Sequence, residues 1–220
     1  MKGIGHFESM YVKKQSPTKL LKSKTMKKII FVTFFIAVFS QIIHADDKID
    51  VKNLLKERID KIIASLGNKD LDDESKTGKI EDIINPIINF PLMSMLALGK
   101  EPWTSLTEED QKRFVALFAE TIKQTLISKI LNYVDEDIVI EESDQVSKKK
   151  INISTFIVSK DKKTAVLYKF YLSGTAWKIY DVEIEGVSIL KNFKAQFTDN
   201  LQEMTAKELI AKMEKSKVSQ

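Results

Sequence analysis

The sequence predicts an α+β fold with N-terminal helices, a four-stranded antiparallel curved sheet and C-terminal helices. Two observations predict it. Apolar residues recur at helical spacing over residues 48–133 and again over 189–215, whereas apolar and polar residues alternate over residues 137–184. Helices, then a run of strands, then helices are typical of a sheet that carries its helices on one face.

The first 45 residues are expected to be an N-terminal extension and a signal peptide. Residues 26–45 begin with two lysines, continue with an apolar run over residues 29–39 and end on the small Ala45. This order is typical of a cleaved secretory signal. A membrane anchor would need about 20 mostly apolar residues. We therefore expect residues 46–220 to be exported as a single domain.

Removal of residues 1–45 also changes the charge and the available chemistry. These residues hold eight lysines and one acid, which leaves 27 basic and 30 acidic residues and a net charge of −3. A nucleic-acid partner is therefore not expected. Both histidines, His6 and His44, lie in the same segment, and the chain has no cysteine. Histidine- or cysteine-based nucleophiles and zinc sites are excluded from the remaining domain, and we expect no catalytic or metal-binding residue.

The first helix of this domain is predicted from an apolar stripe over residues 51–66. Gly67 follows the stripe and is expected to end the helix. The next residues, 68–78, are polar and are expected to form a connection.

Two further helical regions precede the strands. Residues 79–99 read as two apolar helical pieces, because Pro86 and Pro91 interrupt or restart a helix. Capping and acidic residues over 105–110 then predict the start of the longest helix, which reaches about Tyr133.

Four strand candidates follow, separated by short polar turns. The strands are predicted over residues 138–142, 150–159, 163–173 and 176–184. Their close succession predicts an antiparallel meander. The chain then returns to helix, with a break at Thr205, which is expected to cap the final helix.

The third and fourth predicted strands carry apolar residues on both faces. Leu167 and Tyr168 lie on opposite faces of the third strand. In the fourth, alternation puts Ile179 opposite Tyr180 and Val182. Two explanations remain open: helices cover both faces of the sheet, or the sheet and helices enclose an apolar cavity.

Two sequence blocks resemble one known family. Residues 177–197, WKIYDVEIEGVSILKNFKAQF, and the weaker block over residues 96–118, LALGKEPWTSLTEEDQKRFVALF, are similar to the MlaC family of periplasmic phospholipid-binding proteins, also called toluene-tolerance auxiliary proteins. The resemblance extends loosely over residues 48–215.

The resemblance implies an α+β fold that encloses a hydrophobic pocket, and a function without catalysis or cofactor. The family carries phospholipid as cargo between an inner-membrane ABC transporter with MCE domains and an outer-membrane lipoprotein complex, which maintains the lipid asymmetry of the outer membrane. It also implies a periplasmic location, and we expect a monomer.

The candidate lipid-binding residues come from the matched blocks and the neighbouring apolar stripes. They are Leu96, Leu98, Phe114, Phe118, Ile122, Tyr168, Phe170, Trp177, Val182, Val187 and Leu190. Asn192 and Lys194 are candidates for the lipid headgroup, although lysine replaces the arginine of the family pattern and lacks its planar fork.

Three further residues have structural interpretations. Gly186 suits a strained turn between strand and helix, and Ser188 suits a helix N-cap. Asp181 is the best candidate base if the protein is instead a small-molecule isomerase, although alternation directs it away from Tyr180. An envelope adaptor or chaperone with an apolar groove is a third possibility.

Overall fold

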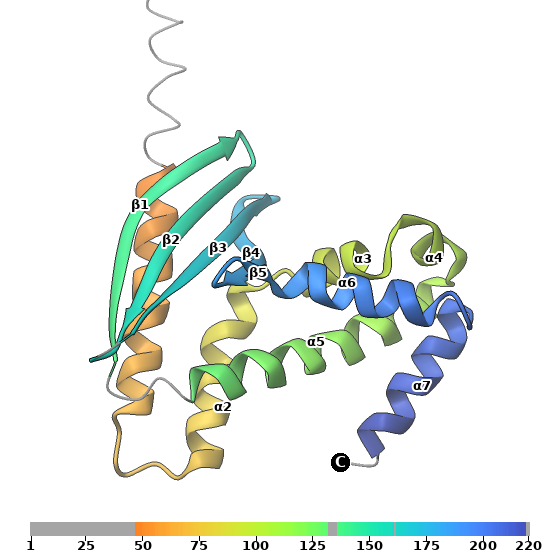
Figure 1. The fold of residues 1–220 in the computed structure, drawn as a ribbon, viewed down its shortest axis with the longest axis horizontal. Coiled ribbons are helices and arrows are strands. Elements are labelled where there is room, and N and C mark those ends of the chain that lie inside the picture. Colours follow the sequence, from red (N-terminus) through yellow and green to blue (C-terminus); the bar gives the residue numbers. More distant parts are fainter. Residues whose placement is uncertain (1–46, 132–135, 161, 219–220) are drawn as a thin grey trace, which may run out of the picture. The chain divides into compact units, whose positions relative to one another are not determined.

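The computed structural model describes residues 47–131, 136–160 and 162–218, so the predicted signal peptide lies outside the described residues. The observed order of helices, sheet and helices confirms the α+β class (Figure 1). After a helix over residues 47–66, called helix 47–66 below, the elements are α2 (Asp73–Ile84), η1 (Asn85–Ile87), α3 (Phe90–Leu98), α4 (Lys100–Ser105), α5 (Glu108–Ile130), β1 (Asp137–Ser147), β2 (Lys150–Val158), β3 (Lys163–Ser173), β4 (Ala176–Ile184), β5 (Val187–Ser188), α6 (Ile189–Asn200) and α7 (Ala206–Val218).

Helix 47–66 ends where the sequence predicts. The Gly67 N–H donates to the Ile63 carbonyl at 2.9 Å, and the helix stops there. The polar connection is shorter than predicted, because α2 begins at Asp73. Asp72 caps α2 by accepting the Ser75 N–H at 2.8 Å. The acidic residues in the first turn, which were predicted to lie in the connection, therefore belong to a helix N-terminus, where negative charge is favourable.

The two prolines divide the next region as predicted. Pro86 lies in the short 3₁₀ helix η1, and Pro91 lies in the first turn of α3, where a missing N–H costs nothing. Asn89 caps α3 by accepting the Leu92 N–H at 3.1 Å. Thr107 caps the long helix α5 by accepting the Asp110 N–H.

The strands form an antiparallel meander in the order β1-β2-β3-β4-β5. The prediction of four strands missed β5, which is two residues long. Glu185 and Gly186 form the two-residue turn between β4 and β5, with φ of 50° and 79°. Positive φ at both positions is typical of the turns that suit a tight hairpin. Ser188 then caps α6 by accepting the Lys191 N–H, which confirms its predicted role.

A β-bulge at Tyr180 corrects the predicted facing of the fourth strand. Lys169 pairs with Asp181 and Phe170 pairs with Ile179, so Tyr180 is an extra residue in β4. The bulge reverses the alternation, and Ile179 lies with Val182 on the core face rather than opposite it.

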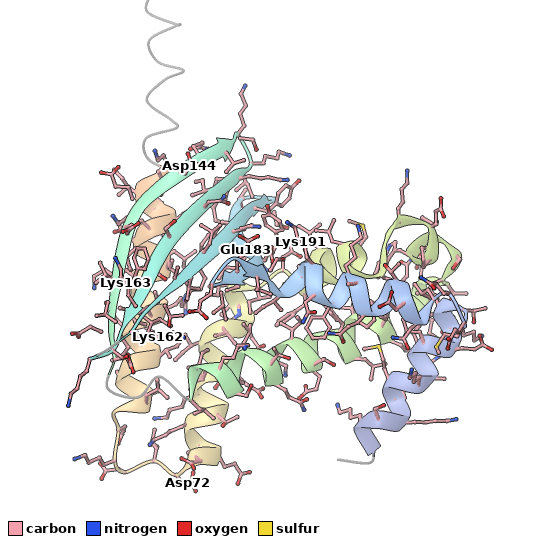
Figure 2. All side chains as sticks on the ribbon, in the orientation of Figure 1. Asp72, Asp144, Lys162, Lys163, Glu183 and Lys191 are labelled. Atoms are coloured by element: carbon pink, nitrogen blue, oxygen red, sulfur yellow. The ribbon has the colours of Figure 1, made fainter. Side chains whose placement is uncertain are left out.

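The outer face of the sheet is covered by contacts among its own side chains. The rings of Tyr171 and Tyr180 meet edge to face at 6.4 Å, and the Lys163 ammonium lies over the Phe156 ring. Other charged side chains, such as Asp144, project from the strands into solvent (Figure 2).

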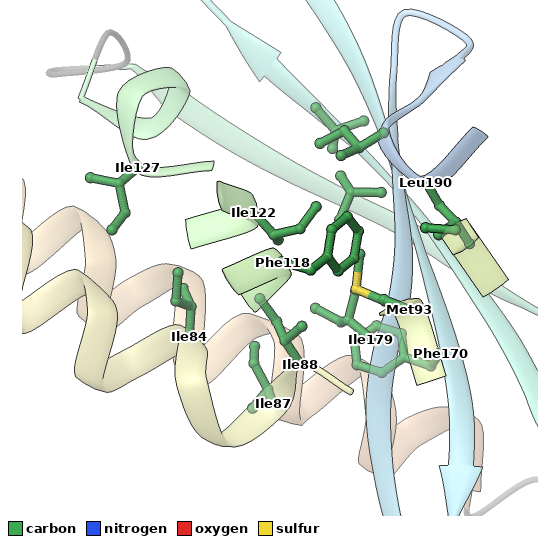
Figure 3. Close-up of a cluster of buried hydrophobic side chains, with 14 of the residues drawn as sticks. Ile84, Ile87, Ile88, Met93, Phe118, Ile122, Ile127, Phe170, Ile179 and Leu190 are labelled. Atoms are coloured by element: carbon green, nitrogen blue, oxygen red, sulfur yellow. The ribbon is translucent and has the colours of Figure 1, made fainter. Parts of the chain in front are cut away.

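The core has a solid part between α5 and α6. Phe114 and Phe118 are stacked at 5.9 Å, and Phe197 meets both edge to face. Trp103 of α4 and Phe193 of α6 complete this aromatic cluster. Towards the sheet most of the core residues are aliphatic, and Phe170 of β3 is a buried ring among them (Figure 3).

Candidate functional site

An apolar cavity of about 120 Å³ lies between the core face of the sheet and the helices that cover it. Helix 47–66, α2, η1 and the C-terminal part of α5 form one wall, and β1 to β4 form the other. Its lining residues are Leu55, Arg58, Ile59, Ile62, Ile63, Leu66, Ile84, Ile87, Ile88, Leu126, Lys129, Ile130, Ile138, Ile157, Val166, Tyr168, Ile179, Val182 and Ile184.

The sheet wall of the cavity is built from cross-strand neighbours. Val166 pairs with Ile184, and Tyr168 pairs with Val182 in the adjoining strands. Side chains directly opposite each other in an antiparallel pair share a face, so these residues form a continuous surface. The bulge adds Ile179, whose carbonyl accepts the Asn89 N–H at 2.8 Å and so ties β4 to the chain after η1.

The cavity opens between helix 47–66 and α5. Of the lining residues, Ile63 and Lys129 are the exposed ones, with Ile63 at 40% of its full exposure. A closed void of about 120 Å³ would cost about 3 kcal/mol of stability relative to a filled core. A fold that leaves such a space unfilled has a place for an apolar ligand.

A smaller void adjoins this cavity. Ile88, Ile179 and Val182 line both spaces, and Met93 and Ile122 close the smaller one from α3 and α5 (Figure 3).

Three of the eleven predicted lipid-binding residues lie at these spaces. Tyr168 and Val182 line the cavity, and Ile122 lines the adjoining void. Both strand residues were predicted from the matched blocks and the neighbouring apolar stripes, and the register places them opposite each other on one face of the sheet.

The other eight predicted residues lie elsewhere. Phe114 and Phe118 belong to the packed aromatic cluster, and Leu98, Phe170 and Leu190 are buried core residues. Leu96 and Val187 are exposed, Val187 at 63%, and Trp177 packs partly buried against the core. A lipid contact by these residues remains a prediction.

The predicted headgroup residues are also distant from the lining. Asn192 and Lys194 lie exposed on α6, and neither lines the cavity. Their contact with a ligand remains a prediction as well.

Asp181 lies on the face of β4 opposite Val182 and does not line the cavity. The Ser188 hydroxyl and the Leu190 N–H donate to its carboxylate at the beginning of α6. The Lys169 ammonium donates to it at 3.1 Å and also donates to Glu183. The bulge brings Tyr180 to the same face as Asp181, which corrects the expectation that they point apart.

This ion cluster joins one cation, Lys169, to two carboxylates, Asp181 and Glu183. Burial by itself would lower the pKa of the Lys169 ammonium, but hydrogen bonds from Lys169 to Glu183 and Asp181, and their charges, raise it above its ordinary value. Asp181 accepts three different donors, so its oxygens are occupied in a structural role.

Within the described ranges, histidine, cysteine and acidic side chains form no cluster that could hold a metal ion. No helix in the part of the chain that the structure describes has the length and apolar character of a membrane span.

Sequence reasoning missed most of the cavity lining. Helix 47–66 supplies Leu55, Ile59, Ile62 and Leu66, which form the apolar stripe that predicted the helix. The stripe indicates a buried face but not whether that face meets a packed core or a cavity, because both need the same spacing.

Comparison with known proteins identifies relatives of this chain and a solved structure with its fold. The model of the family described as MlaC protein matches residues 56–215. The chain is 27% identical over 136 residues to the intermembrane phospholipid transport system binding protein MlaC of Haemophilus influenzae. That alignment covers 60% of this chain and 63% of the relative's length.

A solved structure has the same fold. The phospholipid-binding protein from Ralstonia solanacearum, determined in complex with a phospholipid, matches with a TM-score of 0.67 and 19% identity. The match covers 77% of this chain and 98% of that protein.

Proposed function

The chain belongs to the MlaC family, whose model covers most of it, and we propose that it is a periplasmic carrier that buries the acyl chains of a phospholipid in its cavity. The relatives support this proposal, because the named Haemophilus protein acts in intermembrane phospholipid transport and the Ralstonia protein was solved with a phospholipid bound.

The observation that carries the proposal is the composition of the cavity lining. All lining residues except Arg58 and Lys129 are apolar or aromatic, and eleven of the nineteen are isoleucine. The two acyl chains of a phospholipid contain about 30 methylenes, and their exposure to water costs on the order of 20 kcal/mol. A carrier must provide an apolar surface of this kind to move a lipid through water.

The cavity must enlarge to receive a lipid. Its volume is about 120 Å³, whereas sites for small ligands usually measure about 300–1,000 Å³. Isoleucine side chains are stiff because they branch at Cβ, so side-chain rearrangement alone gives little room. Movement of helix 47–66 away from the sheet would widen the cavity along its length.

The proposed carrier role also includes export of the protein and transfer of lipid between two membrane complexes. Residues 1–45 would direct export and be removed, and residues 46–220 would act as a single domain. The domain would receive and deliver lipid between an inner-membrane ABC transporter with MCE domains and an outer-membrane lipoprotein complex, and so maintain outer-membrane lipid asymmetry. We propose no catalytic step and no cofactor.

The isomerase alternative has less support. It requires an acid or base inside the apolar pocket, but Asp181 lies on the other face of the sheet. The cavity lining contains no acidic side chain.

Lipid extraction tests the proposed function. Residues 46–220, expressed for export and purified without detergent, should yield phospholipid on organic extraction and mass spectrometry. After lipid removal, the folded protein should take up phospholipid from vesicles that are then removed by flotation. A well-folded protein that is lipid-free and takes up none would contradict the proposal.

A further inference from the structure

Two charged side chains line the cavity, and both are cationic. Arg58 comes from helix 47–66 and Lys129 from the last turn of α5. The remaining lining residues that the structure describes are uncharged, so none of these residues supplies a carboxylate to neutralise either cation. The two side chains come from the two elements between which the cavity opens.

Arg58 has a buried guanidinium nitrogen, Nε, that lacks a hydrogen-bond partner among the described residues. The neighbouring acids on helix 47–66 are paired elsewhere, Glu57 with Lys61 and Asp60 with Lys56. A buried donor without an acceptor is costly unless a ligand or water supplies one.

Lys129 is also unpaired across the described residues, since its ammonium makes no hydrogen bond or ion pair there. Lys123, less than two turns earlier on α5, instead contacts both Glu81 and Glu120. A lysine in the last turn of a helix can be explained by the helix dipole alone. Its side chain is exposed and lines the cavity, so its ammonium can also reach a ligand at the opening.

We propose that Arg58 and Lys129 bind the phosphate of the lipid headgroup at the cavity opening and select lipids with a net negative charge. This inference rests on the proposed carrier function. The Arg58 guanidinium can hold two phosphate oxygens at once, and the Lys129 ammonium adds a second positive charge. A zwitterionic headgroup would bring its own ammonium towards two cations, with no carboxylate in the lining to receive it.

Competition between two lipids with the same acyl chains tests the selectivity. The delipidated protein is mixed with vesicles of equal parts dioleoyl phosphatidylglycerol and dioleoyl phosphatidylcholine, and the bound lipids are quantified by mass spectrometry. We expect the wild type to prefer the anionic lipid about tenfold, the scale of one charge-assisted hydrogen bond. In Arg58→Gln/Lys129→Gln the ratio of bound lipids should fall to about one.

A matched variant controls for attraction to the charged vesicle surface. Lys112 on α5 and Lys207 on α7 are exposed and do not line the cavity. Lys112→Gln/Lys207→Gln removes the same charge without releasing an acid beside Arg58 and should retain the wild-type ratio. If Arg58→Gln does not fold, two single variants replace it. Arg58→Lys alone and Lys129→Gln alone should each lower the ratio of bound anionic to zwitterionic lipid.

Three outcomes would overturn the headgroup site. They are lipid uptake without preference by the wild type, an unchanged ratio in Arg58→Gln/Lys129→Gln, and an equal loss of preference in the control variant. Inorganic phosphate at millimolar concentration should not displace the bound lipid; displacement would identify a free-phosphate site instead. Failure to take up either lipid would contradict the carrier function itself and is distinguishable from loss of preference.

Discussion

The Ser188 hydroxyl donates to the carboxylate of Asp181, lying 2.9 Å from Oδ1 and 2.8 Å from Oδ2. The same Oγ accepts the Lys191 N–H at 3.0 Å, so Ser188 joins β4 to the first turn of α6. Both residues are almost fully buried, with 3% of Asp181 and 4% of Ser188 exposed. This contact fixes the angle at which α6 leaves the sheet.

The Asp181→Asn variant should lose stability. It removes one of the two carboxylates that Lys169 contacts and weakens the acceptor of the Ser188 hydroxyl and the Leu190 N–H. Loss of hydrogen bonds to a buried charged group costs about 2 kcal/mol. Urea unfolding of the purified domain measures the change. The control Asp144→Asn, at an exposed position of β1, should remain within about 0.5 kcal/mol of the wild type. Equal stability of the two variants would contradict the structural role.

The contribution of Lys169 should depend on pH. Because its partners raise its pKa, folding favours the protonated form. Its stabilisation is therefore complete below the unfolded-state pKa of about 10.4 and is lost as pH rises through the higher folded-state value. The difference in unfolding free energy between the wild type and Lys169→Met should be constant from pH 7 to pH 9 and should shrink by pH 11. A difference that does not change over this range would contradict the ion cluster.

Hydrophobic periodicity and capping residues in the sequence predict most of the fold, but they assign Ile179 of β4 to the wrong face of the sheet. The boundaries of β2 to β4 and the caps at Ser188 and Thr205 follow from alternation and side-chain chemistry. The facing of Ile179 does not, because the bulge at Tyr180 depends on how β4 pairs with β3. A single extra residue reverses which side chains face the core.

The candidate site is less predictable than the fold for a related reason. Isoleucines at helical spacing, such as Ile59 and Ile62, and large aromatics, such as Phe114 and Phe118, all read as buried. In the structure the isoleucines line a cavity and the aromatics stack on each other. The difference depends on distances between elements, which spacing along one element does not contain.

Substitution of Phe118 should show whether this residue belongs to the packed core or to the lipid-binding site. Phe118 is fully buried among Phe114, Phe193 and Phe197. Phe118→Leu removes ring contacts in this cluster and should cost about 1–2 kcal/mol, measured by urea unfolding. The amount of lipid bound per folded molecule should equal that of the wild type. A loss of lipid without a loss of stability would instead make Phe118 a ligand contact, as the sequence predicted.

Filling the cavity gives the most direct test of the carrier model. Val182 lines both the cavity and the adjoining void, so the indole of Val182→Trp would occupy the space that an acyl chain needs. Overpacking should cost about 1–3 kcal/mol but leave a cooperative unfolding transition.

The matched control is Val146→Trp, because Val146 is 53% exposed in β1, lines neither space and is not a candidate lipid contact. Phospholipid uptake from vesicles, quantified by mass spectrometry, should be lost in Val182→Trp and retained in Val146→Trp. If folded Val182→Trp carries as much lipid as the wild type, the acyl chains bind elsewhere and the cavity is not the carrier site.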